Sequence, residues 1–329
     1  MTDVDASRLL DIRNLTVELA LPEGEMRAVN DVSFFIDAGE TVALVGESGC
    51  GKSMTALAIL GLVPSPPCQA VGGSIRFEGR DLLTLSEEDV RRIRGREIAM
   101  VFQDPMSALN PVLSIGVQLA EGMQVHLGLT RKQALGRAAE LLHLVGIADP
   151  ERRLKQYPHH FSGGMRQRVM IALALSCNPK LIVADEPTTA LDVTIQAEIL
   201  DLLNDLTARL GVALILITHD LGIVARYADR VNVMYAGRIV ETGGTNAIYG
   251  DPRHPYTRGL LGSVPRMDRD RSEPLVAIDG QPPDLTEAAP GCAYGPRCQW
   301  AIEDCNRSVP PLRRVAAGRQ SACFRAEDL

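Results

Sequence analysis

The sequence predicts an α/β fold in which helices cover both faces of a mostly parallel sheet. Two apolar segments, TVALV at 41–45 and LIVAD at 181–185, have the length and composition of strands buried on both faces. The segment TIQAEILDLLNDLTARLG at 194–211 shows the spacing of an amphipathic helix and ends at Gly211. Alternation of such strands and helices is typical of a parallel sheet between helical layers.

The remaining elements follow in chain order. Residues 8–40 predict short strands joined by turns, and therefore an N-terminal antiparallel β subdomain. A helix is expected at 54–63, a strand at 74–79 and a helical subdomain at about 107–165. A third buried strand at 212–218 and a hairpin at 231–243 complete a first domain, residues 1–250.

The last part of the chain, residues 251–329, differs in composition. Proline, arginine and cysteine dominate it, and hydrophobic periodicity fades. We therefore expect a small, separate Cys-rich C-terminal extension.

Charge and hydropathy limit the class of protein. The 329 residues carry a formal net charge of -7, which disfavours nucleic-acid binding. The longest apolar runs, such as VALILI at 212–217, are far shorter than the roughly 20 residues of a membrane-spanning helix. The N-terminus does not resemble a secretion signal. We expect a cytosolic protein whose partners supply any membrane role.

A glycine-rich loop predicts a phosphate-binding site. GESGCGKS at 46–53 matches G-x-x-x-x-G-K-[ST] between a predicted strand and a predicted helix. Backbone N–H groups and the helix N-terminus would surround phosphate oxygens, Lys52 would neutralise them, and the Ser53 hydroxyl would bind Mg²⁺. The residues expected to contact nucleotide here are Gly46, Glu47, Ser48, Gly49, Cys50, Gly51, Lys52, Ser53 and Met54.

Two adjacent carboxylates end the strand LIVAD. Asp185 is expected at the carboxyl edge of the sheet, where it would hold Mg²⁺ directly or through water. Glu186 is placed to polarise the attacking water. The alternative for Glu186 is a solvated loop carboxylate, which its position beside Asp185 disfavours.

A second helix start has the features of an anion site. In FSGGMRQR at 161–168, Ser162 is a candidate N-cap and two glycines follow it. Only one lysine-bearing loop is present, so this site would serve the nucleotide of another chain. The alternative is an ordinary helix cap.

Together these motifs resemble the nucleotide-binding subunits of ABC transporters, which have a P-loop NTPase cassette. GESGCGKS resembles their Walker A motif, LIVADE their Walker B motif and FSGGM their signature. Gln103 in VFQDP resembles the Q-loop glutamine, Asp192 in TALD the D-loop, and His219 in ITHD the switch histidine. The six motifs follow the family order across about residues 10–245.

The resemblance implies that two such subunits pack head to tail around two ATP molecules. The signature residues Ser162, Gly163 and Gly164 would then meet the γ-phosphate held by the opposite subunit. The implied catalytic residues are Glu186, His219 and Gln103, and the implied Mg²⁺ ligands are Ser53, Gln103 and Asp185. Residues 19–29 contain no aromatic side chain, so Leu21 or Met26 is expected to cover the adenine.

The tail narrows the resemblance to peptide and nickel importers. DPRHPYTRGLLGSVP at 251–265, QPPDL and GCAYGPRCQWAIEDC resemble the extension of that group. The chain resembles most the ATPase subunit of a dipeptide importer. The implied partners are a second homologous ATPase subunit, two transmembrane permease subunits and an extracytoplasmic substrate-binding protein, and the implied location is the cytoplasmic face of a bacterial inner membrane.

Two alternatives stay open at this point. Longer peptides or nickel could be the cargo, because cargo contacts lie in other chains. A soluble ABC ATPase acting in translation or DNA repair is the alternative of a different class. The single cassette and the lack of a heptad array favour the transport subunit.

Cysteine usage raises two separate questions. Cys50 lies beside Lys52 and a helix N-terminus, which favour a thiolate, although a small residue fitting a tight turn is the plainer interpretation. In the tail, Cys292, Cys298, Cys305 and Cys323 have five, six and seventeen residues between neighbours.

A reducing cytosol disfavours disulfides, and so little core surrounds these tail thiols that a metal clip would help. Zinc is one candidate, but its short C-x₂₋₄-C spacing is missing. We therefore expect a structural [4Fe–4S] cluster.

Overall fold

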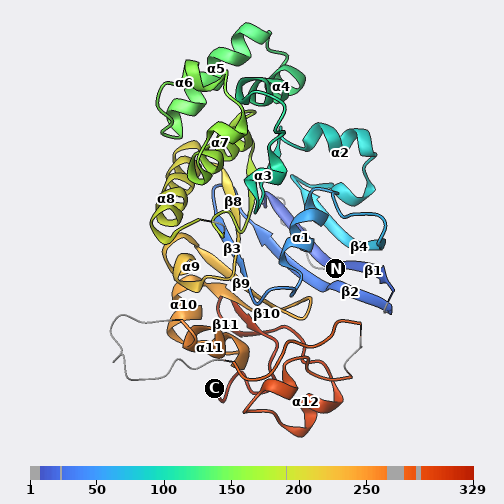
Figure 1. Ribbon diagram of the computed structural model, residues 1–329. Coiled ribbons are helices and arrows are strands. Elements are labelled where there is room, and N and C mark those ends of the chain that lie inside the picture. Colours follow the sequence, from blue (N-terminus) through green and yellow to red (C-terminus); the bar gives the residue numbers. More distant parts are fainter. Residues whose placement is uncertain (1–7, 23, 190, 265–277, 287–289) are drawn as a thin grey trace. The chain divides into compact units, whose positions relative to one another are not determined.

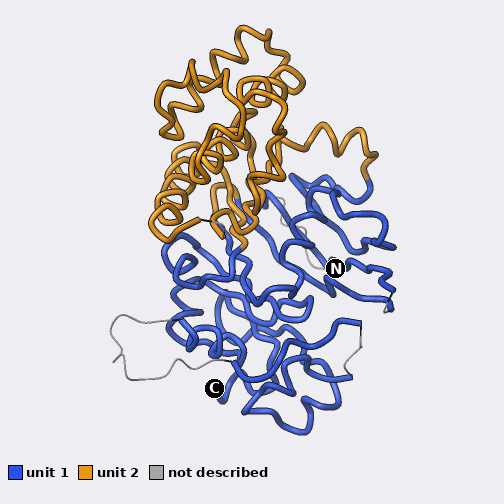
Figure 2. The backbone as a smooth tube through the Cα atoms, viewed as in Figure 1, with its two compact units in different colours: residues 1–37, 41–84, 218–329 blue, residues 38–40, 85–217 orange. Residues whose placement is uncertain are grey.

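The structure, a computed structural model, describes residues 8–22, 24–189, 191–264, 278–286 and 290–329 (Figure 1). The chain divides into two compact units (Figure 2). Unit 1 comprises residues 1–37, 41–84 and 218–329, and unit 2 comprises residues 38–40 and 85–217. Unit 1 thus contains the phosphate loop and the tail, whereas unit 2 contains the Q-loop, Walker B and signature segments.

An antiparallel sheet forms the first part of unit 1. Apolar side chains of its two long strands are buried, among them Leu15, Val17, Val29 and Val32. This confirms the predicted N-terminal antiparallel β subdomain. In the order β2-β1-β4-β5, the sheet consists of β1 (Leu10–Leu21), β2 (Gly24–Ile36), β4 (Cys68–Phe77) and β5 (Arg80–Asp81), followed by the short helix η1 (Leu82–Thr84).

A second sheet of unit 1 carries the phosphate loop. β3 (Thr41–Val45) is buried along its whole length and pairs in parallel with β9 (Arg230–Tyr235). β9 in turn pairs antiparallel with β10 (Arg238–Gly244), which confirms the predicted hairpin. The accompanying helices are α1 (Lys52–Ile59), α9 (Leu221–Tyr227) and α10 (Thr245–Gly250).

The tail adds strands to this second sheet. β12 pairs antiparallel with β10 through Glu241–Ser321 and Thr242–Gln320, and β11 pairs antiparallel with β12. The last strands of the tail therefore extend the second sheet, and the division of the chain at residue 250 stays a prediction. Its elements are α11 (Pro255–Gly262), η3 (Gly295–Arg297), α12 (Glu303–Arg307), β11 (Arg313–Ala316) and β12 (Arg319–Ser321).

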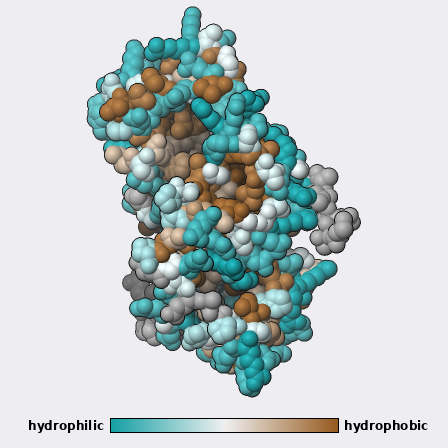
Figure 3. All heavy atoms as spheres, turned by 90° about the vertical axis from the view of Figure 1, so that its right-hand side faces the viewer, coloured by the Kyte–Doolittle hydropathy of each residue, from teal (hydrophilic) through white to brown (hydrophobic). Residues whose placement is uncertain are grey.

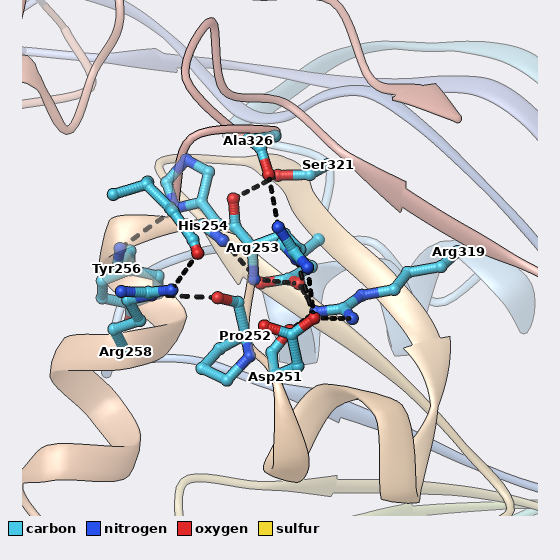
Figure 4. A network of polar contacts seen from close by, with 11 residues as sticks. Asp251, Pro252, Arg253, His254, Tyr256, Arg258, Arg319, Ser321 and Ala326 are labelled. Atoms are coloured by element: carbon cyan, nitrogen blue, oxygen red, sulfur yellow. Dashed lines mark hydrogen bonds and ion pairs between the residues drawn. The ribbon is translucent and has the colours of Figure 1, made fainter. Parts of the chain in front are cut away.

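A buried ion pair fastens the tail to β10, next to the contact between Arg319 and Asp251 that Figure 4 shows. The Glu241 side chain is 0% exposed and accepts a hydrogen bond from Nη2 of Arg319 at 2.9 Å. The same carboxylate accepts the backbone N–H groups of Arg253 at 2.7 Å and His254 at 3.0 Å. The start and the end of the tail thus meet at one carboxylate.

Unit 2 combines a parallel sheet with a helical region. β7 (Leu181–Asp185) pairs in parallel with β6 (Ile98–Val101) and with β8 (Ala213–Thr218). Residues 107–165, where a helical subdomain was expected, contain helices and no strand in this fully described stretch. The helices of the unit are α2 (Glu87–Ile93), α3 (Pro105–Ala108), α4 (Ile115–Leu127), α5 (Arg131–Leu144), α6 (Pro150–Arg153), η2 (Pro158–His160), α7 (Gly163–Leu175) and α8 (Val193–Leu210).

Strand direction differs from the prediction. Parallel pairs join β3 with β9, β6 with β7 and β7 with β8, as the buried apolar strands predict. Antiparallel pairs join β9 with β10, β10 with β12 and β11 with β12. The fold is therefore mixed rather than mostly parallel, because the tail strands RRVA and RQS are polar and their sequence does not reveal them.

Candidate functional site

The phosphate loop, residues 46–53, connects β3 to α1 in unit 1. Gly46, Gly49 and Gly51 have φ angles of 155°, 79° and 103°. A Cβ on Gly46 would lie 2.2 Å from the carbonyl oxygen of Met234, and one on Gly51 would lie 2.3 Å from that of Ala28. The conformation of the loop therefore requires the glycines that the motif supplies.

Lys52 lies inside this loop at the start of α1. It is 4% exposed, and its Nζ donates to the carbonyl oxygens of Gly46 and Glu47 at 2.9 Å each. Ser48, Gly49 and Ser53 are exposed, and Met54 is half-buried. A lysine, a helix N-terminus and an exposed hydroxyl form a site suited to a phosphate and its metal ion. The individual nucleotide contacts of these residues stay predictions.

The expectation of a thiolate at Cys50 is wrong. The side chain is 5% exposed, and burial raises the pKa of its thiol even though Lys52, whose Nζ lies 3.8 Å from Sγ, acts in the opposite direction. A Cβ on Gly46 would lie 2.8 Å from this Sγ. Cys50 is thus the small residue that fills a tight turn.

Glu47 is bonded to two tail residues that the sequence analysis missed. Nη1 and Nη2 of Arg297 donate to its two carboxylate oxygens at 2.7 and 3.0 Å. The Tyr256 hydroxyl accepts the Glu47 backbone N–H at 2.8 Å. Arg297 is 250 positions away from Glu47, so no local pattern could reveal the pair.

In unit 2, the carboxyl end of β7 brings Gln103 and Glu186 together. Nε2 of Gln103 donates to Oε2 of Glu186 at 3.0 Å, and the Thr189 hydroxyl donates to the same oxygen at 2.9 Å. Glu186 has a φ of 44°, and Asp185 before it is 6% exposed. Thr189 was absent from the predicted set. The sequence signal that could have identified Thr189 is its hydroxyl group three positions after Glu186.

The signature segment starts α7 beside α8. Ser162 is the N-cap, and its Oγ accepts the N–H of the residue three positions later at 3.3 Å. Gly163 follows it, and a Cβ on Gly164 would lie 2.8 Å from Cγ2 of Ile195, so Gly164 allows α7 and α8 to pack closely. Asp192 caps α8 by accepting the Ile195 N–H at 3.1 Å. Ser162, Gly163 and Asp192 are exposed, as contact with another chain requires.

Three further predicted residues lie at exposed or half-exposed positions. His219 is exposed directly after β8. Met26 pairs with Leu19 across the β1–β2 hairpin, and Leu21 pairs with Gly24 near its turn. The contacts of His219 with a phosphate, and of Leu21 or Met26 with adenine, stay predictions.

The four tail cysteines line one pocket. Cys292, Cys298, Cys305 and Cys323 share it with Tyr294, Trp300 and several other side chains. Its volume is about 20 Å³, which is room for roughly one water molecule. Burial raises the pKa of Cys292, Cys298 and Cys323, in the last case to about 11.

The structure shows no preformed site for zinc at these thiols. Zn–S bonds of about 2.3 Å in a tetrahedron place the sulfur atoms about 3.8 Å apart. Across the described residues, no group of three or more His, Cys, Asp or Glu side chains is arranged to hold a metal ion. The four thiols therefore line a common space but do not form a metal-binding arrangement among the described residues.

Comparison with known proteins covers nearly the whole chain. Residues 29–189 match the family described as "ABC transporter", and residues 240–305 match "Oligopeptide/dipeptide transporter, C-terminal region". The chain is 51% identical over 324 residues to a probable peptide ABC transporter ATP-binding protein of Sinorhizobium fredii, covering 98% of this chain and 97% of the relative. It is 52% identical over 303 residues to the dipeptide transport ATP-binding protein DppD of Bacillus subtilis, covering 92% and 90%.

A solved structure is also similar. It is a dimeric ATP-binding cassette in a post-hydrolysis state, bound to ADP and phosphate. The TM-score is 0.63 at 28% identity, and the match covers 72% of this chain and 98% of the solved one.

Proposed function

This chain belongs to the ATP-binding proteins of ABC transporters, and on that premise we propose that its hydrolysis of ATP drives the import of dipeptides or oligopeptides into a bacterium. The assignment of peptides as the cargo rests mainly on the match of residues 240–305 to the C-terminal region of oligopeptide and dipeptide transporters. The relatives named above carry peptide or dipeptide transport in their names, and their identity extends through the tail. This favours peptides over nickel.

We assign ATP binding to the phosphate loop. The Lys52 ammonium, held by two loop carbonyls at 2.9 Å, would neutralise the β- and γ-phosphates. By resemblance to the family, Ser53, Gln103 and Asp185 would hold Mg²⁺, and the bound ion would neutralise charge on the phosphate oxygens. Hydroxyl, amide and carboxylate oxygens are ligands that Mg²⁺ accepts.

Glu186 is the proposed general base. Its carboxylate would take a proton from the water that attacks the γ-phosphorus. The bond between that phosphorus and the β–γ bridging oxygen would break, so that ADP leaves and inorganic phosphate forms. Gln103 and Thr189 both donate to its Oε2, at 3.0 and 2.9 Å, so the carboxylate is already oriented. His219 would contact the same phosphate group in its own subunit.

The signature segment is proposed to act on a second ATPase subunit. Ser162, Gly163 and Gly164 would contact the γ-phosphate held by the opposite chain, and Asp192 would lie at the same interface. The dimeric state of the similar cassette that carries ADP and phosphate supports pairing. We propose a homologous but distinct partner, and therefore a heterodimer.

Membrane subunits complete the proposed assembly. None of the helices in the described ranges has the length and hydrophobicity that a bilayer crossing requires. The face drawn in Figure 3 carries patches of hydrophobic surface bordered by polar side chains. In unit 2, exposed apolar side chains follow the Q-loop, with Met106 51% and Val112 76% exposed.

These side chains would contact one of two permease subunits at the cytoplasmic face of the inner membrane. A substrate-binding protein would deliver peptide from the other side.

We also propose that the tail pocket binds a [4Fe–4S] cluster with a structural role. Four thiols that line one space supply the donor set of such a cluster, although among the described residues they are not arranged to hold a metal ion. A volume of about 20 Å³ means that the walls would move outward on loading. Iron would bind the four side chains as thiolates, so loading would release thiol protons.

Metal and acid-labile sulfide analysis tests the cluster. Protein purified without oxygen should contain about four irons and four sulfides per chain. The variant Cys298→Ser should lose both, whereas Cys68→Ser, outside the tail, should keep them. Zinc without sulfide, or four titratable tail thiols without metal, would contradict the proposal.

Reconstitution of the transporter tests the import function. The chain would be combined with its second ATPase subunit, its permeases and its substrate-binding protein in vesicles. Dipeptide-loaded binding protein should stimulate ATP hydrolysis and uptake of labelled peptide, and Lys52→Ala should abolish both. Stimulation by nickel but not by any peptide would refute the peptide assignment.

A further inference from the structure

The tail reaches the phosphate loop through an arginine. The two carboxylate oxygens of Glu47 each accept one terminal nitrogen of Arg297, at 2.7 and 3.0 Å. Such bidentate pairs are geometrically specific and stronger than single hydrogen bonds. The Arg297 side chain is 6% exposed and that of Glu47 is 25% exposed, so water screens the pair only in part.

The guanidinium of Arg297 is itself held in place. Its Nε donates to the Asp279 carbonyl oxygen at 2.9 Å, and Nη1 donates to the Tyr235 hydroxyl at 3.3 Å. Hydrogen bonding to Glu47 raises the pKa of Arg297, so its positive charge persists at any pH near neutrality. The arginine therefore presents a fixed charge to the loop.

The same arginine lies directly beside a lining residue of the cysteine pocket, although its own side chain is not part of the pocket wall. Arg297 ends the short helix η3, and Cys298 follows it directly. The Cys298 N–H donates to the Gly295 carbonyl oxygen at 3.1 Å, and the Gly295 N–H donates to that of Cys292 at 2.9 Å. One compact turn thus joins two thiols of the pocket to the residue that holds Glu47.

A second contact strengthens this connection. The Tyr256 hydroxyl accepts the Glu47 N–H at 2.8 Å, and the Tyr256 ring is 0% exposed. Its centroid lies 4.5 Å from that of Tyr235 and 5.4 Å from that of Tyr294, another pocket residue. The Glu47 carbonyl oxygen in turn accepts a hydrogen bond from Nζ of Lys52 at 2.9 Å. Glu47 thus connects the tail to the lysine of the loop.

Charge determines the direction of the effect. A nucleotide brings several negative charges to the loop, and Glu47 places another one within it. Arg297 neutralises that carboxylate. Without the guanidinium, the partly buried Glu47 would repel the phosphates at a low effective dielectric, and the loop would lose one restraint.

We propose that Arg297 is a positioning residue of the phosphate loop. Through this arginine, the conformation of the four-cysteine pocket would set the affinity of the chain for nucleotide. This inference rests on the proposed function. Coupling between two sites is reciprocal, so nucleotide in the loop must also stabilise the closed pocket.

Equilibrium titration of the full chain with Mg-ATP tests the first half of the proposal. Arg297→Ala should bind ATP about tenfold more weakly than the wild type, or weaker still. Arg297→Lys keeps the positive charge but cannot form the bidentate contact, so its affinity should lie between those of the wild type and Arg297→Ala. The control Arg307→Ala removes an exposed tail arginine that pairs with Glu303 and should change affinity less than twofold. Unchanged affinity in Arg297→Ala would overturn the proposal.

A second substitution shows whether the loss of affinity comes from the unpaired charge of Glu47 or from an unfolded tail. In the Arg297→Ala background, Glu47→Gln removes the unpaired carboxylate and should restore most of the affinity. A tail that had simply unfolded would not be rescued. Trp300, the single tryptophan of the chain, lines the pocket and reports its integrity by fluorescence.

The reciprocal half is measured at Cys298, in protein that metal analysis shows to contain no iron. Saturating Mg-ATP should slow its labelling by iodoacetamide severalfold in the wild type and should have no effect in Arg297→Ala. Equal labelling with and without ATP in the wild type would overturn the link between pocket and loop. A wild-type chain that does not bind ATP at all would instead refute the proposed function, so the two failures are distinguishable.

Discussion

The substitution Arg319→Met removes the cation that balances a fully buried carboxylate. The side chains of Arg319 and Glu241 are 6% and 0% exposed, and their atoms lie 2.9 Å apart. Removal of one partner from a buried ion pair costs about 3–5 kcal/mol, because the other charge stays desolvated. Glu241 keeps the N–H groups of Arg253 and His254, so we expect a loss near the lower bound, about 3 kcal/mol.

Urea unfolding followed by Trp300 fluorescence measures this loss, because the only tryptophan lies in the tail. The control Arg313→Met breaks an exposed pair with Glu327, whose side chains are 42% and 68% exposed, and should cost less than about 1 kcal/mol. Adding Glu241→Gln to Arg319→Met should recover part of the loss. An effect of Arg319→Met no larger than that of the control would refute the reasoning.

Three further predictions concern titration, thiol access and loop geometry. Burial lowers the pKa of His254 from 6.5 to about 3, so the folded state resists protonation. The tail should therefore lose up to roughly 1.4 kcal/mol of stability per pH unit as the pH falls below 6.5. The variant His254→Asn, which can still cap α11, should show a smaller slope in acid unfolding, and an unchanged slope would contradict this role of His254. Mass spectrometry after brief alkylation of the native chain should find Cys68 modified before the buried Cys50, and the reverse order would restore the thiolate hypothesis. Gly51→Ala places a Cβ 2.3 Å from a backbone oxygen of β2 and should abolish ATP binding, whereas Gly250→Ala meets no atom within 4 Å and should leave it intact.

The sequence predicted elements whose cause is local. β3 and β7 are short apolar segments that remain buried, and α8 combines hydrophobic periodicity with Gly211 at its end, so all three lie close to the predicted positions. β11 and β12 could not be predicted, because polar segments become strands only by pairing with a distant strand.

In the candidate site, too, features with a local cause could be predicted and features that depend on distant contacts could not. The glycines and Lys52 of the phosphate loop follow from the motif, whereas the bond between Glu47 and Arg297 depends on the folded tail. Cys50 misled the sequence analysis because neighbouring charge was visible in the sequence and burial was not. Desolvation then outweighs the lysine.

Hydrolysis by Glu186→Gln tests the central claim most directly. The change keeps the size of the side chain and removes the proton acceptor, so the assembled transporter should bind Mg-ATP normally and lose turnover by about 10²–10⁴-fold. The control Glu198→Gln alters an exposed carboxylate of α8 that pairs with Arg168 and should hydrolyse ATP at the wild-type rate. Near-normal turnover by Glu186→Gln in the assembled complex would contradict the account of this chain as an ATPase with Glu186 as its base.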